Sequence, residues 1–392
     1  MTRLGLVTVC TAVLFCLSSA FAQDRPARVI VNDRGVNSRT IGPGAPAHII
    51  GLTGLNHQVD LDTGKVNYSL LYASCIDAKD PKAAIPGEGY IGMPGPSACN
   101  WYHSGFFDLE INGKSIGKTM IHSVTVRSVA DRGFADFVFD TPMAVVRLRF
   151  VAVAGGDCLY AQTLLEPKEE IKSVRLTTRC YPSAFVSNSD RHVLTPTRDL
   201  KQGEKAALDL AREWWTLYYD SVYDAGYLGP TYQGAGPCAM LWVPSQTETA
   251  SFTVGGYGTD TVFNLKPALR DFRFVFFDQT GTKNADAMVS LRTRGAELLK
   301  ALATFQFTDP SLANWNLTQK QEELRKMLAA VPEDKTTAAK YEAWSLKLGE
   351  QLKLIQTSGV GSIMAETAAA TTIGEWERGL PELKLAALLR EI

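Results

Sequence analysis

The stretch Val146-Arg147-Leu148-Arg149-Phe150 (VRLRF) alternates apolar and charged side chains. Successive side chains of a β-strand point to opposite faces, so this period of two predicts a strand with one apolar face. Val174-Arg175-Leu176-Thr177 shows a similar alternation. The segments 106–111 and 115–119 flank Asn112-Gly113, the strongest short signal for a two-residue hairpin turn. These stretches predict a protein built largely from antiparallel strands.

More strands are expected across the first two thirds of the chain, separated by Gly, Pro and Asn. They do not alternate with helices, which argues against a parallel α/β sheet. We therefore predict a mainly β plus α protein: a large antiparallel β-sandwich followed by a C-terminal helical domain. The size is similar to that of the large two-sheet sandwiches, including supersandwich-like ones, found in many carbohydrate-active proteins, an analogy of fold only. The further strand candidates are 28–31, 66–75, 123–128, 135–139, 251–254, 261–265 and 272–277.

Two regions depart from the β pattern. The segment 203–219 (GEKAALDLAREWWTLYY) has apolar residues at helical spacing and predicts a helix inserted into the sandwich. From residue 284 onward, helical periodicity dominates, with Pro310 and Pro332 interrupting it. The expected domains are a sandwich over 23–283 and a helical domain over 284–392.

The first 22 residues have the features of a secretory signal peptide. Arg3 supplies the positive start, 4–17 is an uncharged and mostly apolar run, and Ala20-Phe21-Ala22 fits a cleavage site. We expect cleavage after Ala22 and a periplasmic or extracellular protein; an uncleaved anchor is the alternative. No later stretch has the roughly 20 apolar residues that a membrane span needs.

Composition excludes some classes of function. The chain has 392 residues, 40 of them basic and 41 acidic, with a formal net charge of -1. Nucleic-acid binding is not expected, because no basic excess is available to neutralise phosphates. The segment 113–119 has one residue too few between its glycines for a phosphate-binding loop, and no dinucleotide fingerprint occurs. The five histidines lack metal-ligand spacing, so we expect neither a cofactor nor a metal site.

Export changes the interpretation of the cysteines. Of seven, Cys10 and Cys16 would leave with the signal peptide, so five would remain. Exported proteins form structural disulfides, and Cys75 and Cys99 bracket a Pro/Gly-rich loop that a bridge would restrict. One or two disulfides are expected, with buried free thiols as the alternative.

An unusual density of aromatic side chains marks 214–232, beside several carboxylates and followed by a Gly/Pro-rich loop. Aromatic faces stack on the C–H faces of sugar rings, and carboxylates accept hydrogen bonds from sugar hydroxyls. Trp101-Tyr102-His103 offers a similar combination around an imidazole. The residues predicted to bind ligand are Trp101, His103, Asp220, Tyr223, Asp224, Tyr227 and Tyr232.

Three hypotheses of function follow. The first is carbohydrate recognition, with glycan processing as an extension. The second is a non-enzymatic envelope protein that docks a protein partner through its helical tail. The third is a hydrolase whose site is assembled across the fold. Loop aromatics exposed on one sheet face would favour the first hypothesis, and an exposed apolar stripe on the tail helices would favour the second. A pocket that holds two facing carboxylates, or a histidine with a carboxylate, would favour the third.

Overall fold

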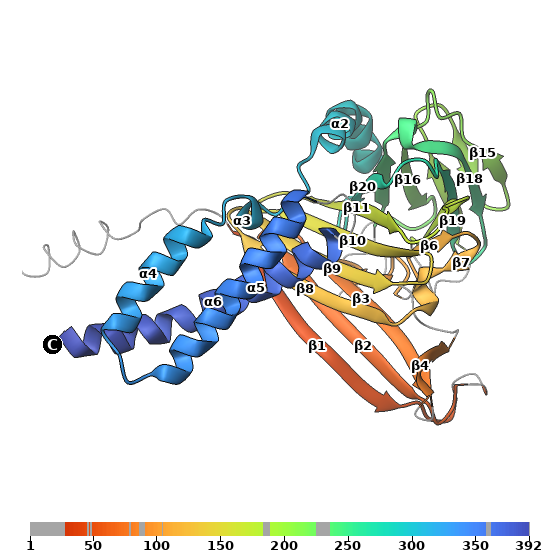
Figure 1. Ribbon diagram of the computed structural model, residues 1–392. Coiled ribbons are helices and arrows are strands. Elements are labelled where there is room, and N and C mark those ends of the chain that lie inside the picture. The colour runs from red at the N-terminus through yellow and green to blue at the C-terminus, as the bar shows by residue number, and fades with distance from the viewer. Residues whose placement is uncertain are drawn as a thin grey trace, which may run out of the picture.

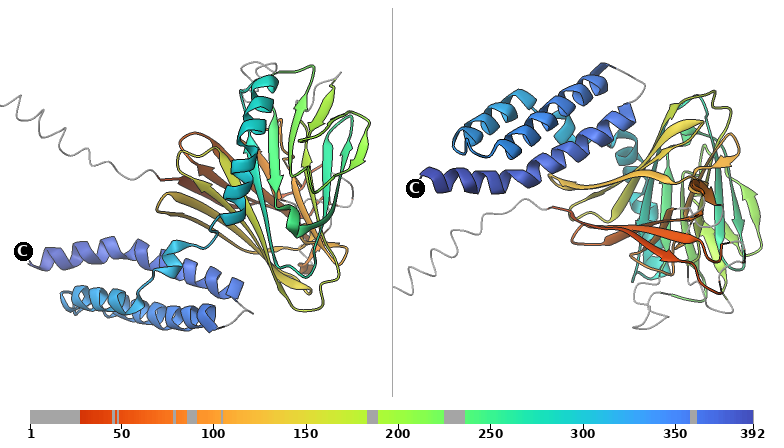
Figure 2. Two further views of the ribbon diagram at one scale, coloured as in Figure 1. Left: turned by 90° about the horizontal axis from the view of Figure 1, so that it is seen from above. Right: turned by 60° about the horizontal axis from the view of Figure 1, so that its bottom comes forward.

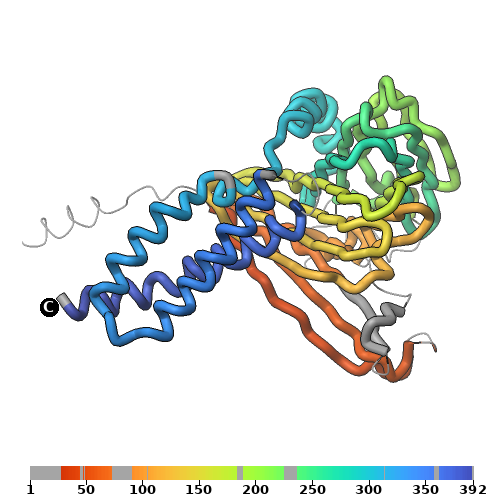
Figure 3. Tube along the Cα trace, in the orientation of Figure 1, coloured from red at the N-terminus to blue at the C-terminus, as the bar shows by residue number. Residues whose placement is uncertain are grey.

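The computed structural model describes residues 28–44, 47, 49–77, 80–85, 91–103, 105–182, 189–224, 236–357 and 362–391. Two large antiparallel sheets are followed by a C-terminal helical region, which confirms the predicted class of fold. Figure 3 follows the chain from the strands at one edge of the molecule to the helices at its C-terminal end. The expected signal peptide lies outside the described residues.

The first sheet has eleven strands, in the order β1-β2-β3-β5-β6-β12-β19-β18-β15, with β4 paired to β3 and β7 paired to β6. The expected hairpin is present: Asn112 and Gly113 have φ of 51° and 75°, the left-handed pair that a tight hairpin turn requires. The strands are β1 (Ile30–Thr40), β2 (Thr53–Asp62), β3 (Asn67–Asp77), β4 (Asp80–Ile85), β5 (Ile91–Gly95), β6 (Phe107–Ile111), β7 (Lys114–Ser115), β12 (Val174–Cys180), β15 (Lys205–Ala207), β18 (Thr247–Val254) and β19 (Thr259–Leu265).

The second sheet has nine strands, in the order β14-β13-β16-β17-β20-β11-β10-β9-β8. All its neighbours pair in antiparallel fashion. The strands are β8 (Ile121–Val129), β9 (Arg132–Asp140), β10 (Ala144–Val153), β11 (Cys158–Pro167), β13 (Arg191–Leu194), β14 (Asp199–Lys201), β16 (Trp215–Asp220), β17 (Cys238–Trp242) and β20 (Asp271–Asp278).

The main core lies between the two sheets and is rich in aromatic side chains. The side chains of VRLRF in β10 alternate between the two faces of the strand as expected, and Val146, Leu148 and Phe150 point into this core. Arg147 and Arg149 point to the other face of the second sheet, yet they are only 4% and 3% exposed. Buried guanidinium groups need charge partners, so something must cover that outer face.

The C-terminal helices cover it. They are α2 (Asn284–Thr304), α3 (Pro310–Ala313), α4 (Leu317–Ala329), α5 (Lys335–Thr357) and α6 (Ser362–Glu391). The carboxylate of Glu366 on α6 pairs with Arg147, and that of Asp136 on β9 pairs with Arg149 at 2.6 Å. Near the start of α6, the Ile363 N–H donates to Glu166 of β11 at 2.8 Å. These polar contacts fix the start of α6 on the second sheet.

The helices form two packing groups (Figure 2). Helix α2 packs on the second sheet, where Leu291 and Leu298 meet Trp215 and Leu217 of β16. Helices α4, α5 and α6 form a bundle with its own core around Tyr341, Leu348 and Trp376, and this bundle projects away from the sheets.

The end of α6 carries an apolar face: Leu385, Leu388 and Leu389 are 59%, 58% and 63% exposed. This is the kind of stripe that the partner-docking hypothesis requires, and a protein partner for the tail remains a prediction. Within the described ranges, no helix combines the length and apolarity needed to cross a bilayer.

The prediction of a helix over 203–219 is wrong. The segment contains strand β15, a turn, and strand β16. Tyr218 faces the inter-sheet core, whereas Trp215, Leu217 and Tyr219 face α2. Because both faces of β16 are covered, all six of its residues are buried, and its sequence lacks the alternation that identifies a half-exposed strand.

The expected disulfides are not found in the described structure. Cys99, Cys158, Cys180 and Cys238 are buried free thiols, so the predicted Cys75–Cys99 bridge is absent. The alternative of buried free thiols describes these four cysteines. The side chain of Cys75 lies outside the description.

Candidate functional site

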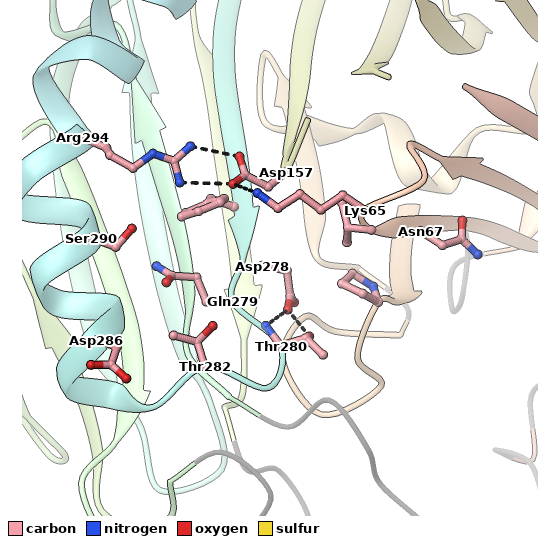
Figure 4. Close-up of a pocket in the computed structure, with 13 residues that line it drawn as sticks. Lys65, Asn67, Asp157, Asp278, Gln279, Thr280, Thr282, Asp286, Ser290 and Arg294 are labelled. Carbon is pink, nitrogen blue, oxygen red and sulfur yellow. Dashed lines mark hydrogen bonds and ion pairs between the residues drawn. The ribbon is translucent and has the colours of Figure 1, made fainter. Parts of the chain in front are cut away.

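A cavity of about 560 Å³ opens where the central strands of the second sheet end beside helix α2 (Figure 4). Strand β11 begins at Cys158, which pairs with Phe277 of β20, so the adjacent Asp157 and Asp278 flank each other at this end. The turn between β2 and β3 supplies Lys65, and the first turns of α2 supply residues from the opposite wall. Four segments far apart in the sequence thus meet around one cavity.

Asp157 holds two cations at the rim. Its carboxylate accepts hydrogen bonds from the Arg294 guanidinium at 3.0 and 3.1 Å and from the Lys65 ammonium at 2.7 Å. Burial alone would raise the pKa of Asp157, but these bonds outweigh burial and lower the pKa to about 2. The Arg294 guanidinium also lies over the Phe277 ring, 4.9 Å from its centroid. Asp157 therefore stays ionised, and both cations are already paired.

Asp278 is in the opposite electrostatic situation. It is 7% exposed, and burial raises its pKa to about 6, although hydrogen bonds to its carboxylate oppose the rise. Those bonds come from the Thr280 hydroxyl, from the Thr280 N–H at 2.9 Å, and from the Asn100 amide at 3.0 and 3.1 Å. No cation in the described structure bonds to this carboxylate, so Asp278 changes its charge near neutral pH.

The Tyr68 hydroxyl bonds to the backbone of both Asp157 and Asp278. Its hydroxyl donates to the Asp157 carbonyl at 2.6 Å and accepts from the Asp278 N–H at 3.3 Å. The side chain is fully buried, so the spacing of the two strand ends is set by a rigid group.

The remaining walls combine neutral polar groups with a few apolar surfaces. Asn67, Gln279, Thr282 and Ser290 offer amides and hydroxyls, and Asp286 adds a carboxylate from the first turn of α2. Buried polar atoms normally have a partner, yet the Gln279 side-chain nitrogen has none among the described residues. The apolar portion consists of Val66, Pro96 and Phe277.

Trp101, predicted to bind ligand, lies in the inter-sheet core with no exposed surface. Its ring makes edge contacts with Phe106, Tyr218 and Phe276. A ring enclosed on all sides has no face to offer a sugar, so Trp101 is a core residue. His103, two residues further on, is exposed at the same end of the sandwich as the cavity, and its N–H donates to the Tyr181 hydroxyl at 3.2 Å.

The predicted residues 220–224 lie at and just after the end of β16, and their two aspartates accept hydrogen bonds from backbone N–H groups. Asp220 is 1% exposed and accepts from the N–H groups of Val222 and Tyr223 at 2.9 and 3.3 Å. Tyr223 itself is 8% exposed. Asp224 accepts from the N–H of Asn284 at 2.7 Å, where α2 begins. The Asp224 carboxylate thus positions the start of the helix that lines the cavity, together with the Asp220 carbonyl, which accepts from the Asn284 side-chain amide at 2.6 Å.

Tyr227 and Tyr232 lie outside the described residues. The residues that sequence reasoning missed are Lys65, Asp157, Asp278 and Arg294. Each comes from a different segment of the sequence, and only Asp278 carried a local signal, because it directly follows the predicted strand 272–277.

No family model matches this sequence, and no curated protein matches it either. Among solved structures, the α-galactosidase AgaA of Geobacillus stearothermophilus, a GH36 enzyme, is similar with a TM-score of 0.33 and 11% identity; the match covers 57% of this chain and 41% of that one. The α-N-acetylgalactosaminidase NagBb of Bifidobacterium bifidum is similar with a TM-score of 0.38 and 9% identity, over 70% of this chain and 41% of that one.

A TPR-domain-containing protein of Parabacteroides distasonis also has a TM-score of 0.38, with 7% identity, over 66% of this chain and 56% of that one. The chain spans about two fifths of the length of the two glycosidases and just over half that of the third protein.

Proposed function

We propose that the cavity between α2 and the ends of β11 and β20 binds carbohydrate. The observation that carries the proposal is the pairing of charges at its rim: Lys65 and Arg294 are both bonded to Asp157. A site for phosphate or carboxylate ligands keeps its cations available for the ligand. Here the groups left over are amides, hydroxyls and carboxyls, which hydrogen-bond neutral hydroxyl groups.

Shape and apolar surface agree with such a ligand. Small-molecule sites are typically about 300–1,000 Å³, and the cavity of about 560 Å³ lies within that range. Pro96 and Val66 provide apolar surface for the C–H face of a sugar ring, and Gln279 adds an amide whose nitrogen has no partner among the described residues. Export to the periplasm or the cell exterior, proposed from the N-terminal segment, would place the protein among free glycans.

The test blocks the cavity without disturbing the core. Ser290 lines it from α2, so Ser290→Trp fills it with a large ring. The neighbouring Val289 is 66% exposed, and Val289→Trp is the matched control because it adds the same ring to the solvent side of the helix. Binding to a panel of neutral oligosaccharides is measured by calorimetry and thermal shift.

We expect saturable binding of one glycan class by the wild type and by Val289→Trp, and its loss in Ser290→Trp. If Ser290→Trp binds as well as the wild type, the ligand does not enter this cavity. If neither the wild type nor the control binds any glycan in the panel, the proposed function is wrong.

A hydrolase is the second candidate, favoured by the divergent pKa values of the two carboxyl groups. Such divergence separates a proton donor from a permanent anion in many glycosidases. Asp278, with its pKa of about 6, would donate the proton, while Asp157 stays ionised between Lys65 and Arg294. Release of reducing ends by the wild type, abolished in Asp278→Asn with binding retained, would support hydrolysis. Binding without turnover would leave a recognition protein.

A further inference from the structure

A cluster of three tyrosines lies at the same end of the sandwich as the cavity. The ring centroids of Tyr102 and Tyr181 are 4.4 Å apart. The ring centroid of Tyr257 lies 6.1 Å from that of Tyr102 and 5.7 Å from that of Tyr181. Tyr102 and Tyr181 are largely covered, whereas Tyr257 is 54% exposed. We call Tyr102, Tyr181 and Tyr257 the tyrosine cluster.

The loop that presents Tyr257 is held on several sides. It is the hairpin loop Gly255-Gly256-Tyr257-Gly258 between β18 and β19, closed by a hydrogen bond from the Gly255 N–H to the Gly258 carbonyl at 2.8 Å. The Arg191 guanidinium of the facing sheet donates to the Gly256 carbonyl. At Gly258, a Cβ atom would lie 2.5 Å from the Tyr102 hydroxyl, so the loop packs directly on the cluster. The exposed ring is therefore pre-organised.

One residue joins the cluster to the cavity. The side-chain amide of Asn100 bonds to Asp278 on the cavity wall, and the Asn100 carbonyl accepts from the Tyr181 N–H at 2.7 Å. Tyr102 follows two residues later, which an extended chain spans in about 7 Å. The exposed tyrosine and the cavity thus lie close enough for one chain of linked sugar rings to contact both.

We propose that the tyrosine cluster is a second carbohydrate subsite and that the ligand is an oligo- or polysaccharide extending from the cavity onto Tyr257. This inference rests on the proposed function of the cavity. A tyrosine ring offers a rigid apolar face with few rotatable bonds, so stacking costs little conformational entropy. Two linked subsites raise the affinity of a ligand that reaches both, because the second contact is intramolecular.

The experiment compares ligand lengths. Calorimetry is run with glucose-, mannose- and galactose-based neutral oligosaccharides, from the monosaccharide to the hexasaccharide, on the wild type, Tyr257→Ala and Tyr257→Phe. We expect wild-type affinity to rise with length in one series. Tyr257→Ala should weaken binding of the longest member by roughly 2- to 12-fold and leave the shortest unchanged, while Tyr257→Phe keeps the ring and the affinity. Melting temperatures verify that all three proteins are folded.

The outcomes separate the two proposals. If a glycan binds but Tyr257→Ala matches the wild type at every length, the second subsite is wrong and the cavity site stands. If Tyr257→Ala weakens every length equally, Tyr257 belongs to the primary site and the division into subsites is wrong. If Ser290→Trp retains binding that Tyr257→Ala loses, the cavity proposal fails and the tyrosine cluster is itself the site. If the wild type binds no glycan, both proposals fail.

Discussion

Replacing Asp278 by asparagine should stabilise the protein at neutral pH. The pKa of the buried carboxyl is raised from 3.8 to about 6, so folding above pH 6 forces a charge into a poorly solvated position. A group whose folded pKa is raised lowers stability as the pH rises through the interval between the two values. The penalty is complete above about pH 6 and absent below about pH 4. Its size corresponds to on the order of 3 kcal/mol, at about 1.36 kcal/mol per pKa unit.

Asparagine has nearly the shape of aspartate and keeps an oxygen to accept from Thr280 and Asn100. Its new amide nitrogen replaces the oxygen that now accepts from the Asn100 amide nitrogen at 3.0 Å, so this hydrogen bond is lost. The substitution therefore removes the buried charge at a cost of about 1 kcal/mol for one hydrogen bond. We expect a gain of about 2 kcal/mol at pH 7.5, which disappears as the pH falls to 4.

Urea unfolding of the wild type and Asp278→Asn, followed by tryptophan fluorescence from pH 4 to pH 8, measures this difference. Asp286→Asn is the control, since it removes an exposed carboxylate of the same cavity from the first turn of α2. That change should cost about 0.3–1 kcal/mol by the helix dipole, with no gain. Loss of stability in Asp278→Asn at pH 7.5, or a gain that does not vary between pH 4 and pH 8, would refute the reasoning. A confirmed gain would mean that the wild type retains a destabilising group in its cavity, as functional sites often do.

Three further perturbations test other parts of the fold. Glu366→Ala leaves the buried Arg147 guanidinium without its paired carboxylate and should cost about 3–5 kcal/mol, measured as a lower urea midpoint. Gly258→Ala places a methyl group 2.5 Å from the Tyr102 hydroxyl and should cost about 1–3 kcal/mol; an unchanged melting temperature would mean that the loop packs loosely. Burial would raise the pKa of Glu213, yet hydrogen bonds from an arginine and two threonines lower it to about 2. Ionised Glu213 therefore stabilises the folded protein above pH 4.5, and this stabilisation is lost as the pH falls toward 2. Glu213→Gln should therefore flatten the loss of stability in acid, which unfolding curves between pH 2 and pH 6 would reveal.

Strands with one face toward the core were predictable from the sequence. In β10 the period of two in VRLRF reports the burial of alternate side chains, and in β6–β7 the Asn112-Gly113 pair reports a backbone that requires positive φ. Strand β16 was not predictable, because α2 covers the face that would otherwise have been polar.

The candidate site was much less accessible to sequence reasoning. The density of aromatic residues over 214–232 predicted a ligand site there. In the structure, Tyr218 and Trp215 instead pack against two different layers of the fold. Trp101 shows the same limitation, since sequence position does not distinguish a core ring from an exposed one. By contrast, the segment around Trp101 and His103 does lie at the end of the sandwich where the cavity and Tyr257 are found.

The sequence by itself determined the class of the fold: antiparallel strands first and helices afterward, because side-chain periodicity is a local property of each segment. Only the tertiary structure decided which charges meet. Lys65, Asp157, Asp278 and Arg294 come from four separate segments, and the strand register brings them to one cavity. The different pKa shifts of the two aspartates arise from burial and from neighbours distant in the sequence, because electrostatic interactions depend on distance in space.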